Sequence, residues 1–290
     1  MIRPLAATAL LLLAATSCGS DPNSREPVES SAGTASPDTV AVTTADTEAQ
    51  ATTTVEAPGL RLVGLGDSYP GALNCGGECT SYVELLGAAA TSALGQDVTV
   101  TNLASNDSLT ARELLRRVQE EDAYIDALRA ADIVTIQVGN NDWQGPCSSN
   151  GHELCLDNGR ASVGRQLADI IEVIHQLRGD QPTAIRVVTY PNASIGDPGI
   201  SGPWAFDDTP EEMAVFQEWF AAALAAFDDT ICEVAVENGA ICVDVRDAFN
   251  GPSHDQDAGA LLAAEHGHPS ASGHQLIADT IAAMGFAPVG

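Results

Sequence analysis

From residue 60 onward, short apolar stretches alternate with longer amphipathic ones, and this alternation constrains the fold more than any other feature of the chain. The short stretches are typical of buried strands and lie at 60–65, 98–103, 132–138, 184–189 and 240–245. Helical spacing of apolar residues marks 81–94, 109–118, 124–130, 163–177, 210–236 and 272–284. Strands separated by helices predict a parallel sheet with helices on both faces. We therefore expect one three-layer α/β/α domain over residues 59–290, with Ser108 and Gly95 among its helix caps.

The first 58 residues have a different composition. Arg3 precedes an apolar run at 5–15 that is too short to span a bilayer, which is typical of a signal peptide over 1–18. The run ends at Ala15-Thr16-Ser17-Cys18, a string that resembles a bacterial lipobox and would make Cys18 the lipidated first residue. An ordinary signal peptide cut nearby is the alternative, and both predict export. Residues 19–58 lack aromatic side chains and are rich in Ser, Thr, Ala, Pro and acids, so they are expected to form a disordered tether.

The charge balance excludes one class of partner. The chain has 40 acidic residues against 12 arginines, without one lysine, and a formal net charge of −28. Nucleic-acid affinity depends on cationic contacts to phosphates, so we do not expect nucleic-acid binding. The acidity is typical of a solvated surface.

Cysteine spacing agrees with export. Beyond Cys18 there are six cysteines, an even number that indicates disulfides in an oxidising compartment. Six cysteines permit 15 pairings. Their positions form three local pairs, and we predict the bonds Cys75–Cys79, Cys147–Cys155 and Cys232–Cys242. A zinc site is the alternative, but paired C-x-x-C knuckles are missing.

Polar signatures follow the expected strands, where an open α/β sheet collects its functional groups. They are Gly66-Asp67-Ser68-Tyr69, the turn at 102–107, Gly139-Asn140-Asn141-Asp142 and, before the last helix, Glu265-His266-Gly267-His268-Pro269. Acyl transfer to serine needs a base that takes the hydroxyl proton and donors fixed around the developing oxyanion. A serine, two asparagine-rich turns and a late histidine supply these groups.

In these blocks the chain resembles the SGNH (GDSL-type) hydrolases, and the likeness covers about 60–285. The resemblance implies a flavodoxin-like parallel sheet, ester hydrolysis without metal or cofactor, and Ser68 as the nucleophile. Asn141 would be the side-chain oxyanion donor and His268 the base, while Gly66, Asp67, Gly139 and Asp142 would support the turns. We expect the strand order 2-1-3-4-5. The leader and the cysteine pairs also resemble the secreted actinobacterial branch.

Two positions depart from the family pattern. Asn106 stands where glycine usually provides a backbone oxyanion donor, but any residue other than proline keeps that N–H. Asparagine also tolerates left-handed backbone conformations. Glu265 stands where aspartate is usual, three residues before His268, and with one more methylene it could reach and orient the imidazole by a different loop path. The alternative is a backbone carbonyl that orients the ring and gives a weaker dyad.

The sequence thus predicts a monomeric, extracytoplasmic serine esterase with the triad Ser68, His268 and Glu265. Its oxyanion donors would be the N–H groups of Ser68 and Asn106 with the side chain of Asn141. Polysaccharide acetyl groups, short-chain esters and lipid acyl esters are all compatible substrates. His266 and His274 compete with His268 for the role of base, and His254, Asp255, Asp257, His266 and His268 match no familiar metal-ligand set.

Two other functions remain open at this point. One is a non-catalytic ligand-binding lipoprotein of the same fold, which the departures at Asn106 and Glu265 would support. The other is a flavodoxin-like cofactor protein, which needs a phosphate-binding loop after the first strand. An acid and a proline, Asp67 and Pro70, stand in that loop.

Overall fold

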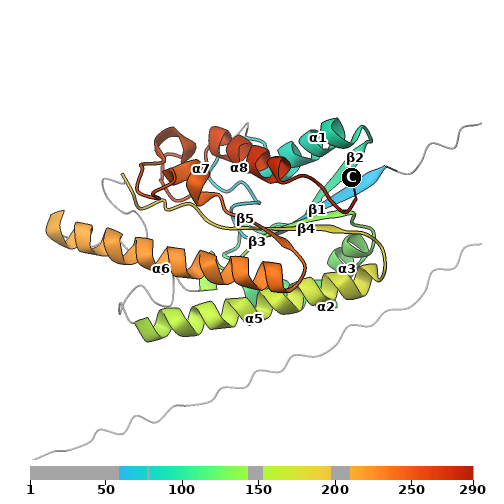
Figure 1. Ribbon diagram of the computed structural model, residues 1–290, viewed down its shortest axis with the longest axis horizontal. Coiled ribbons are helices and arrows are strands. Elements are labelled where there is room, and N and C mark those ends of the chain that lie inside the picture. Colours follow the sequence, from blue (N-terminus) through green and yellow to red (C-terminus); the bar gives the residue numbers. More distant parts are fainter. Residues whose placement is uncertain (1–58, 77–78, 143–152, 197–209, 290) are drawn as a thin grey trace, which may run out of the picture. The chain divides into compact units, whose positions relative to one another are not determined.

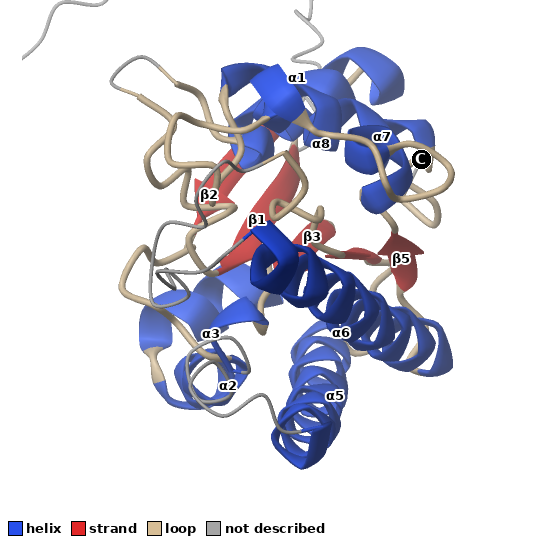
Figure 2. Cartoon of the chain, turned by 90° about the vertical axis from the view of Figure 1, so that its left-hand side faces the viewer, coloured by secondary structure: helices blue, strands red, loops and turns tan. Residues whose placement is uncertain are grey.

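The computed structural model describes residues 59–76, 79–142, 153–196 and 210–289. Within them a five-stranded sheet has the order β2-β1-β3-β4-β5, and every neighbouring pair is parallel, as the sequence predicted. The strands are β1 (Leu60–Gly66), β2 (Val98–Asn102), β3 (Ile133–Gln137), β4 (Ala184–Val188) and β5 (Ile241–Val243). Figures 1 and 2 show the helices in two layers, one on each face of this sheet.

One layer holds α1 (Tyr82–Leu94), α7 (Arg246–Asn250) and α8 (Ala271–Ala283). The other holds α2 (Ala111–Glu120), α3 (Asp122–Arg129), α5 (Glu153–Arg178) and α6 (Pro210–Glu237). Alternate strand residues pack into opposite layers: Leu62 joins the apolar cluster under α1 and α8, and Val63 joins the cluster against α2 and α5. A sheet covered on both faces needs strands that are apolar throughout, which explains the continuous apolar runs.

Of the two predicted helix caps, Gly95 is confirmed and Ser108 is not. The Ser81 side chain accepts the backbone N–H of Val83 and caps α1, which ends at Gly95 in the left-handed region. The expected cap of α2, Ser108, is wrong. Thr110 caps that helix by accepting the N–H of Glu113, and Ser108 itself has φ +54 in the preceding turn.

The largest difference between a predicted and an observed helix is at the start of α5, which begins at Glu153 and not near residue 163. Asn158 and Gly159 are weak helix formers and hide the helical pattern of the first turns. Packing of α5 against α6 and α2 outweighs that propensity. The short helix α7 and a 3₁₀ turn at Gly259–Leu261 also lacked any periodic signal.

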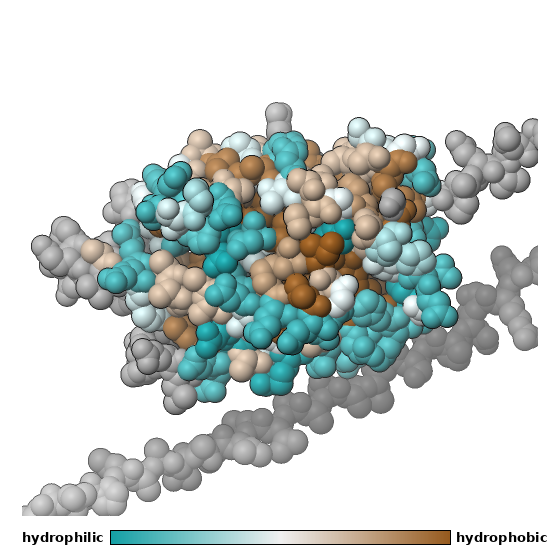
Figure 3. Space-filling model, in the orientation of Figure 1, coloured by the Kyte–Doolittle hydropathy of each residue, from teal (hydrophilic) through white to brown (hydrophobic). Residues whose placement is uncertain are grey.

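Two of the three predicted disulfides are confirmed, Cys75–Cys79 and Cys232–Cys242. The second joins the end of α6 to β5, and the first closes a turn just before α1. The predicted bond Cys147–Cys155, Cys18 and residues 1–58 as a whole lie outside the described residues. Among the helices that are described, none is both long and apolar enough to cross a membrane. Hydrophilic residues predominate over α5, at the lower edge of the face in Figure 3.

Candidate active site

The predicted nucleophile lies in a tight turn directly after β1. Gly66 ends the strand with φ +142, and a Cβ atom there would meet the carbonyl oxygen of Gln137 at 2.0 Å, so only glycine fits. The carbonyl of Asp67 then accepts the N–H of Gly71, and that of Ser68 accepts the N–H of Leu73. These bonds wind the chain around Ser68 and hold its side chain at the carboxyl edge of the sheet.

Backbone hydrogen bonds join this turn to the polar blocks after β2 and β3. The N–H of Ser105 donates to the carbonyl of Gly66 at 3.0 Å. On the other side, the N–H of Asp67 donates to the carbonyl of Gln137 at 3.1 Å. The block after β3 starts at Gly139, where φ is +123 and a Cβ atom would lie 2.7 Å from the Phe227 ring. Three segments that are distant in sequence therefore form one edge.

The late histidine block completes the constellation. The Nε2 atom of His268 lies 3.0 Å from the Oγ atom of Ser68, across 200 sequence positions. Its Nδ1 atom lies 2.7 Å from the Oε1 atom of Glu265. A carboxylate only accepts hydrogen bonds, so Nδ1 carries the ring hydrogen and Nε2 presents a lone pair to the serine hydroxyl. The geometry is that of a hydroxyl poised to lose its proton to an oriented imidazole.

The other two histidines near this block do not meet the serine in the structure. His274 is fully buried on α8, and its Nδ1 accepts the backbone N–H of Tyr82. Burial lowers the pKa of His274 to about 4, so its ring is neutral. His266 stands in the loop before His268 with φ +56. Within the part of the chain that the structure describes, His268 is the candidate that lies within hydrogen-bond distance of Ser68.

Asp67 supports the nucleophile turn from inside the protein. It is completely buried, accepting the Tyr190 hydroxyl at 2.6 Å and the N–H of Tyr69 at 3.2 Å. Burial raises the pKa of Asp67 to about 7, and the nearby carboxyl of Asp142 adds to the rise. These contacts fit the structural role predicted for Asp67, because its carboxyl is buried and holds Tyr190 and the backbone of Tyr69.

Asp142 connects the block after β3 with α2. Its Oδ2 atom accepts the N–H of Ala111, the first residue of α2, at 2.8 Å. A carboxylate at a helix N-terminus satisfies an otherwise unpaired N–H and faces the positive end of the helix dipole. Burial raises the pKa of Asp142 to about 6.

The two predicted asparagine donors are held by different contacts. The Nδ2 atom of Asn141 donates to the carbonyl of Leu109 at 2.9 Å, which fixes its amide plane. The Nδ2 atom of Asn106 donates to the carbonyl of Gly71 at 3.2 Å, so this side chain is folded over the nucleophile turn. The left-handed residue of this turn is Ser108, not Asn106. The argument from left-handed tolerance therefore does not explain the asparagine.

Two tyrosines at the site were missed by the sequence interpretation. Tyr190 follows β4, the one central strand end where no candidate was named, and it holds Asp67. Tyr69 follows Ser68 directly, and its hydroxyl donates to the carbonyl of Gly267 beside His268. Both are buried aromatic residues at strand ends, and their position there was the available signal.

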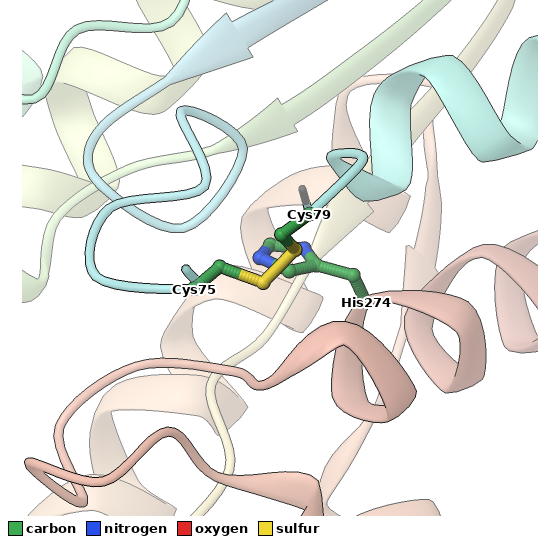
Figure 4. A group of neighbouring side chains, drawn as sticks. All are labelled: Cys75, Cys79 and His274. Carbon is green, nitrogen blue, oxygen red and sulfur yellow. A yellow bond between two sulfur atoms is a disulfide. The ribbon is translucent and has the colours of Figure 1, made fainter. Parts of the chain in front are cut away.

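One group of described side chains has metal-ligand character, Cys75, Cys79 and His274 (Figure 4). Their ligand atoms lie within 4.8 Å of one another. The two cysteines form a disulfide, and thiolate is the form of cysteine that binds metals. Nδ1 of His274 accepts a hydrogen bond, so Nε2 carries the hydrogen and has no lone pair for a metal. In this state the group does not fit a metal ion.

Comparisons with known proteins agree with the arrangement. The model of the GDSL-like lipase/acylhydrolase family matches residues 65–276. Among solved structures, a lipase from a goat rumen metagenome is similar with a TM-score of 0.64 and 17% identity, covering 80% of this chain and 100% of that one. The extracellular lipase of Streptomyces rimosus has a TM-score of 0.56 and 20% identity, covering 77% of this chain and 99% of that one.

An acetyl xylan esterase is also similar, with a TM-score of 0.51, 17% identity and coverage of 78% and 100%. No curated protein matches the chain. At these identities the solved structures show the shared fold, whereas the family model spans more than half of the sequence and contains all the site blocks described above. The chain belongs to the GDSL-like lipase/acylhydrolase family.

Proposed function

We propose that the protein is an extracytoplasmic serine esterase that hydrolyses carboxylic esters through an acyl-serine intermediate. The observation that carries this proposal is the continuous contact from Ser68 Oγ through the His268 ring to Glu265. The three side chains are partly exposed, with 19% of the His268 side chain and 33% of the Glu265 side chain accessible, so a substrate can approach them.

In the acylation step, Nε2 of His268 takes the proton of the Ser68 hydroxyl while Oγ attacks the ester carbonyl carbon. The carbonyl oxygen becomes negative and receives hydrogen bonds from the N–H groups of Ser68 and Asn106 and from the Asn141 side chain. Glu265 stabilises the imidazolium that forms and keeps the ring in the required tautomer. When the C–O bond breaks, His268 returns the proton to the alcohol, which leaves.

In the deacylation step, water takes the place of the alcohol. His268 removes one proton from the water, whose oxygen attacks the acyl carbon of the acyl-serine. The same donors hold the second oxyanion. When the bond to Oγ breaks, His268 gives the proton back to Ser68, and the carboxylic acid is released. No electron transfer is involved, and the enzyme returns to its starting state.

The substrate class is inferred from the composition of the chain. The chain contains only 4% aromatic residues, and no long apolar segment of a kind that would cover a lipid stands out in its sequence. Small or polar esters, such as acetyl groups on a polysaccharide or short-chain esters, are therefore favoured over bulk lipid.

The location is proposed from two observations. The two disulfides are typical of an oxidising compartment, as expected for an exported protein. The lipobox-like string would anchor the protein at the outer face of the cell membrane through Cys18, with the domain acting as a monomer. Incorporation of an alkyne-labelled fatty acid into the wild-type protein, and its loss in Cys18→Ala, would test the anchor.

The function is tested by comparing the purified protein with its Ser68→Ala variant on p-nitrophenyl acetate, butyrate and octanoate. We expect hydrolysis by the wild type and its loss in the variant, with acetate or butyrate preferred over octanoate. Ser92→Ala, an exposed serine in the last turn of α1, is the matched control and should keep full activity.

A fluorophosphonate probe separates the esterase from the non-catalytic alternative. An esterase is labelled covalently at Ser68, and mass spectrometry locates the adduct. A binding protein that keeps the fold without the chemistry would show neither labelling of Ser68 nor turnover above the variant, and that result would overturn the proposal.

A further inference from the structure

Tyr69 connects the nucleophile to the histidine loop. It follows Ser68 in the chain, only 3% of its surface is exposed, and its hydroxyl donates to the carbonyl of Gly267 at 3.0 Å. Its ring also lies against the imidazole of His268, with 5.6 Å between the ring centres. One side chain thus contacts both the backbone and the side chain of the segment that carries the base.

We propose that Tyr69 is a positioning residue that holds the His268 loop in register with Ser68 through its hydroxyl, an inference that rests on the esterase function proposed above. The described residues join the loop to the nucleophile turn at two hydrogen bonds, Ser68–His268 and Tyr69–Gly267. The first is broken and remade in every turnover, because its proton moves. The second takes no part in the reaction and persists throughout the cycle.

The histidine loop needs such an external tie. It is closed on itself by the N–H of Ala263, which donates to the carbonyl of His268 at 2.8 Å, and by an isolated bridge between Leu262 and Pro269. Within it, His266 has φ +56, a conformation that non-glycine residues rarely adopt. The loop is therefore compact, and Ser270 at the start of α8 joins its base through bonds to the carbonyls of Leu261 and Ala260. Among the described residues, the hydrogen bonds that reach the nucleophile turn are those of His268 and Tyr69.

Tyr69 is itself fixed from the opposite side. Its backbone N–H donates to Oδ1 of Asp67, and its ring packs edge-on against Tyr190, with 5.1 Å between the ring centres. Tyr190 in turn donates its hydroxyl to Oδ2 of Asp67. A side chain that is locked by packing and by supporting hydrogen bonds can hold a catalytic group within a fraction of an ångström.

The chemistry of the hydroxyl fits a donor and not a second base. Burial raises the pKa of Tyr69 well above its ordinary value, with the carboxyls of Asp67 and Glu265 adding to the rise. The phenol therefore keeps its proton across the working pH range. It donates a hydrogen bond to the carbonyl of Gly267, which has no acid–base function, so this contact can persist throughout the reaction.

The test compares Tyr69→Phe with the wild-type protein in steady-state hydrolysis of p-nitrophenyl acetate. We expect kcat to fall about 10- to 50-fold while KM stays within twofold, because a small displacement of the base affects the reacting geometry and not substrate binding. The matched control is Thr91→Val, which removes a part-buried hydroxyl that donates to the backbone carbonyl of Gly87 at 3.0 Å and accepts the N–H of Val98 at the amino end of β2. It should lower the melting temperature by a similar amount and leave kcat within twofold.

A second variant separates the donor from the ring. Incorporation of p-aminophenylalanine at position 69 keeps a ring and a donor at the same place, and it should restore most of the lost kcat. p-Methoxyphenylalanine keeps the oxygen without the proton and should not. Equal rates for Tyr69→Phe and wild type, or equal losses for Tyr69→Phe and Thr91→Val, would overturn the positioning role.

Fluorophosphonate labelling keeps this result distinct from a failure of the esterase proposal. If the wild type is not labelled at Ser68, the proposed function itself fails. If the wild type is labelled and Tyr69→Phe is labelled at the same rate, the esterase proposal stands and only the positioning role is excluded. A rate of Ser68 labelling that falls in Tyr69→Phe alone supports it.

Discussion

Glu265 and His268 form their contact across a separation of only three residues, with the Oε1 and Nδ1 atoms 2.7 Å apart. The backbone between them turns through His266 at φ +56, which brings the two side chains to the same side of the loop. The acid and the base thus come from one short segment, so they move together relative to Ser68. Backbone pairing within the loop fixes its shape, and the Tyr69–Gly267 hydrogen bond joins it to the nucleophile turn.

Replacing Glu265 by glutamine tests the role of the charge. The variant keeps the side-chain length, but it can donate a hydrogen to Nδ1 and so favour the wrong tautomer of His268. We expect kcat on p-nitrophenyl acetate to fall by about 10²- to 10⁴-fold, by analogy with the same change in other serine triads. The kcat of Glu265→Asp should lie between those of the wild type and Glu265→Gln, because the shorter side chain keeps the charge but does not reach as far.

Asp126→Asn, which changes an exposed acid on α3, is the control and should keep its activity. A loss of less than fivefold in Glu265→Gln would show that the carboxylate is not the orienting group.

Asn141→Ala tests the side-chain oxyanion donor. One amide hydrogen of Asn141 is held by the carbonyl of Leu109, which leaves the second in a fixed direction. We expect kcat to fall by about 10²- to 10³-fold with little change in KM, because the donor acts only when the oxygen becomes negative. Asn238→Ala removes an asparagine that donates to the Val234 carbonyl far along α6, and it should keep its activity. If Asn141→Ala raised KM and left kcat unchanged, Asn141 would be a substrate-binding contact and not an oxyanion donor.

The buried carboxyl of Asp67 should make stability depend on pH. Burial raises its pKa from 3.8 to about 7, so the folded protein binds this proton more tightly than the unfolded chain. Its contribution is therefore complete below about pH 4 and is lost as the pH rises toward 7. The loss is on the order of 4 kcal/mol at most, since one pKa unit corresponds to about 1.4 kcal/mol.

Asp67→Asn imitates the protonated carboxyl at every pH. Urea unfolding of this variant should show a smaller fall in the free energy of unfolding between pH 4 and 7.5 than the wild type shows. Two other buried groups act in opposite directions: the pKa of Asp142, raised to about 6, adds to the fall, and the pKa of His274, lowered to about 4, opposes it between about pH 4 and 6.5. The contribution of Asp67 is therefore read from the difference between the two proteins. Parallel curves for the two proteins would mean that Asp67 is already ionised in the folded state at pH 4.

Removing the Cys232–Cys242 bond should affect stability and not the chemistry. The bond closes a ten-residue separation between α6 and β5, at the edge of the sheet far from Ser68 in sequence. The double alanine variant should lose about 2–3 kcal/mol of unfolding free energy, as chain-entropy estimates give for a loop of this size. Its rate of fluorophosphonate labelling should be unchanged at a temperature where it is folded. Peptide mapping without reductant would show the bond in the wild type and would test the predicted Cys147–Cys155 pair as well.

Much of the fold could be predicted from the sequence because its signals are local. Apolar runs such as that of β1 record burial on both faces, and alternation with helical stretches requires a parallel sheet. The cap of α1 at Ser81 and its end at Gly95 depend on nearby backbone alone. The start of α5 and the cap of α2 could not be predicted this way, because packing against other helices decided the first, and Thr110 competed with Ser108 at close range for the second.

The same distinction between local signals and long-range contacts applies to the candidate site. Motif positions at strand ends pointed to Ser68 and Asn141, since parallel strands bring their carboxyl ends to one edge. The block before α8 pointed to His268 through its resemblance to the family pattern. Whether His268, His266 or His274 meets the serine depends on a turn at positive φ and on the burial of α8, which only the folded chain decides. The contacts of Tyr69 and Tyr190 likewise join residues about 120 to 200 positions apart, beyond the reach of any local pattern. The sequence by itself determined which chemical groups are present and on which edge of the sheet they stand, and the tertiary structure decided which of them touch.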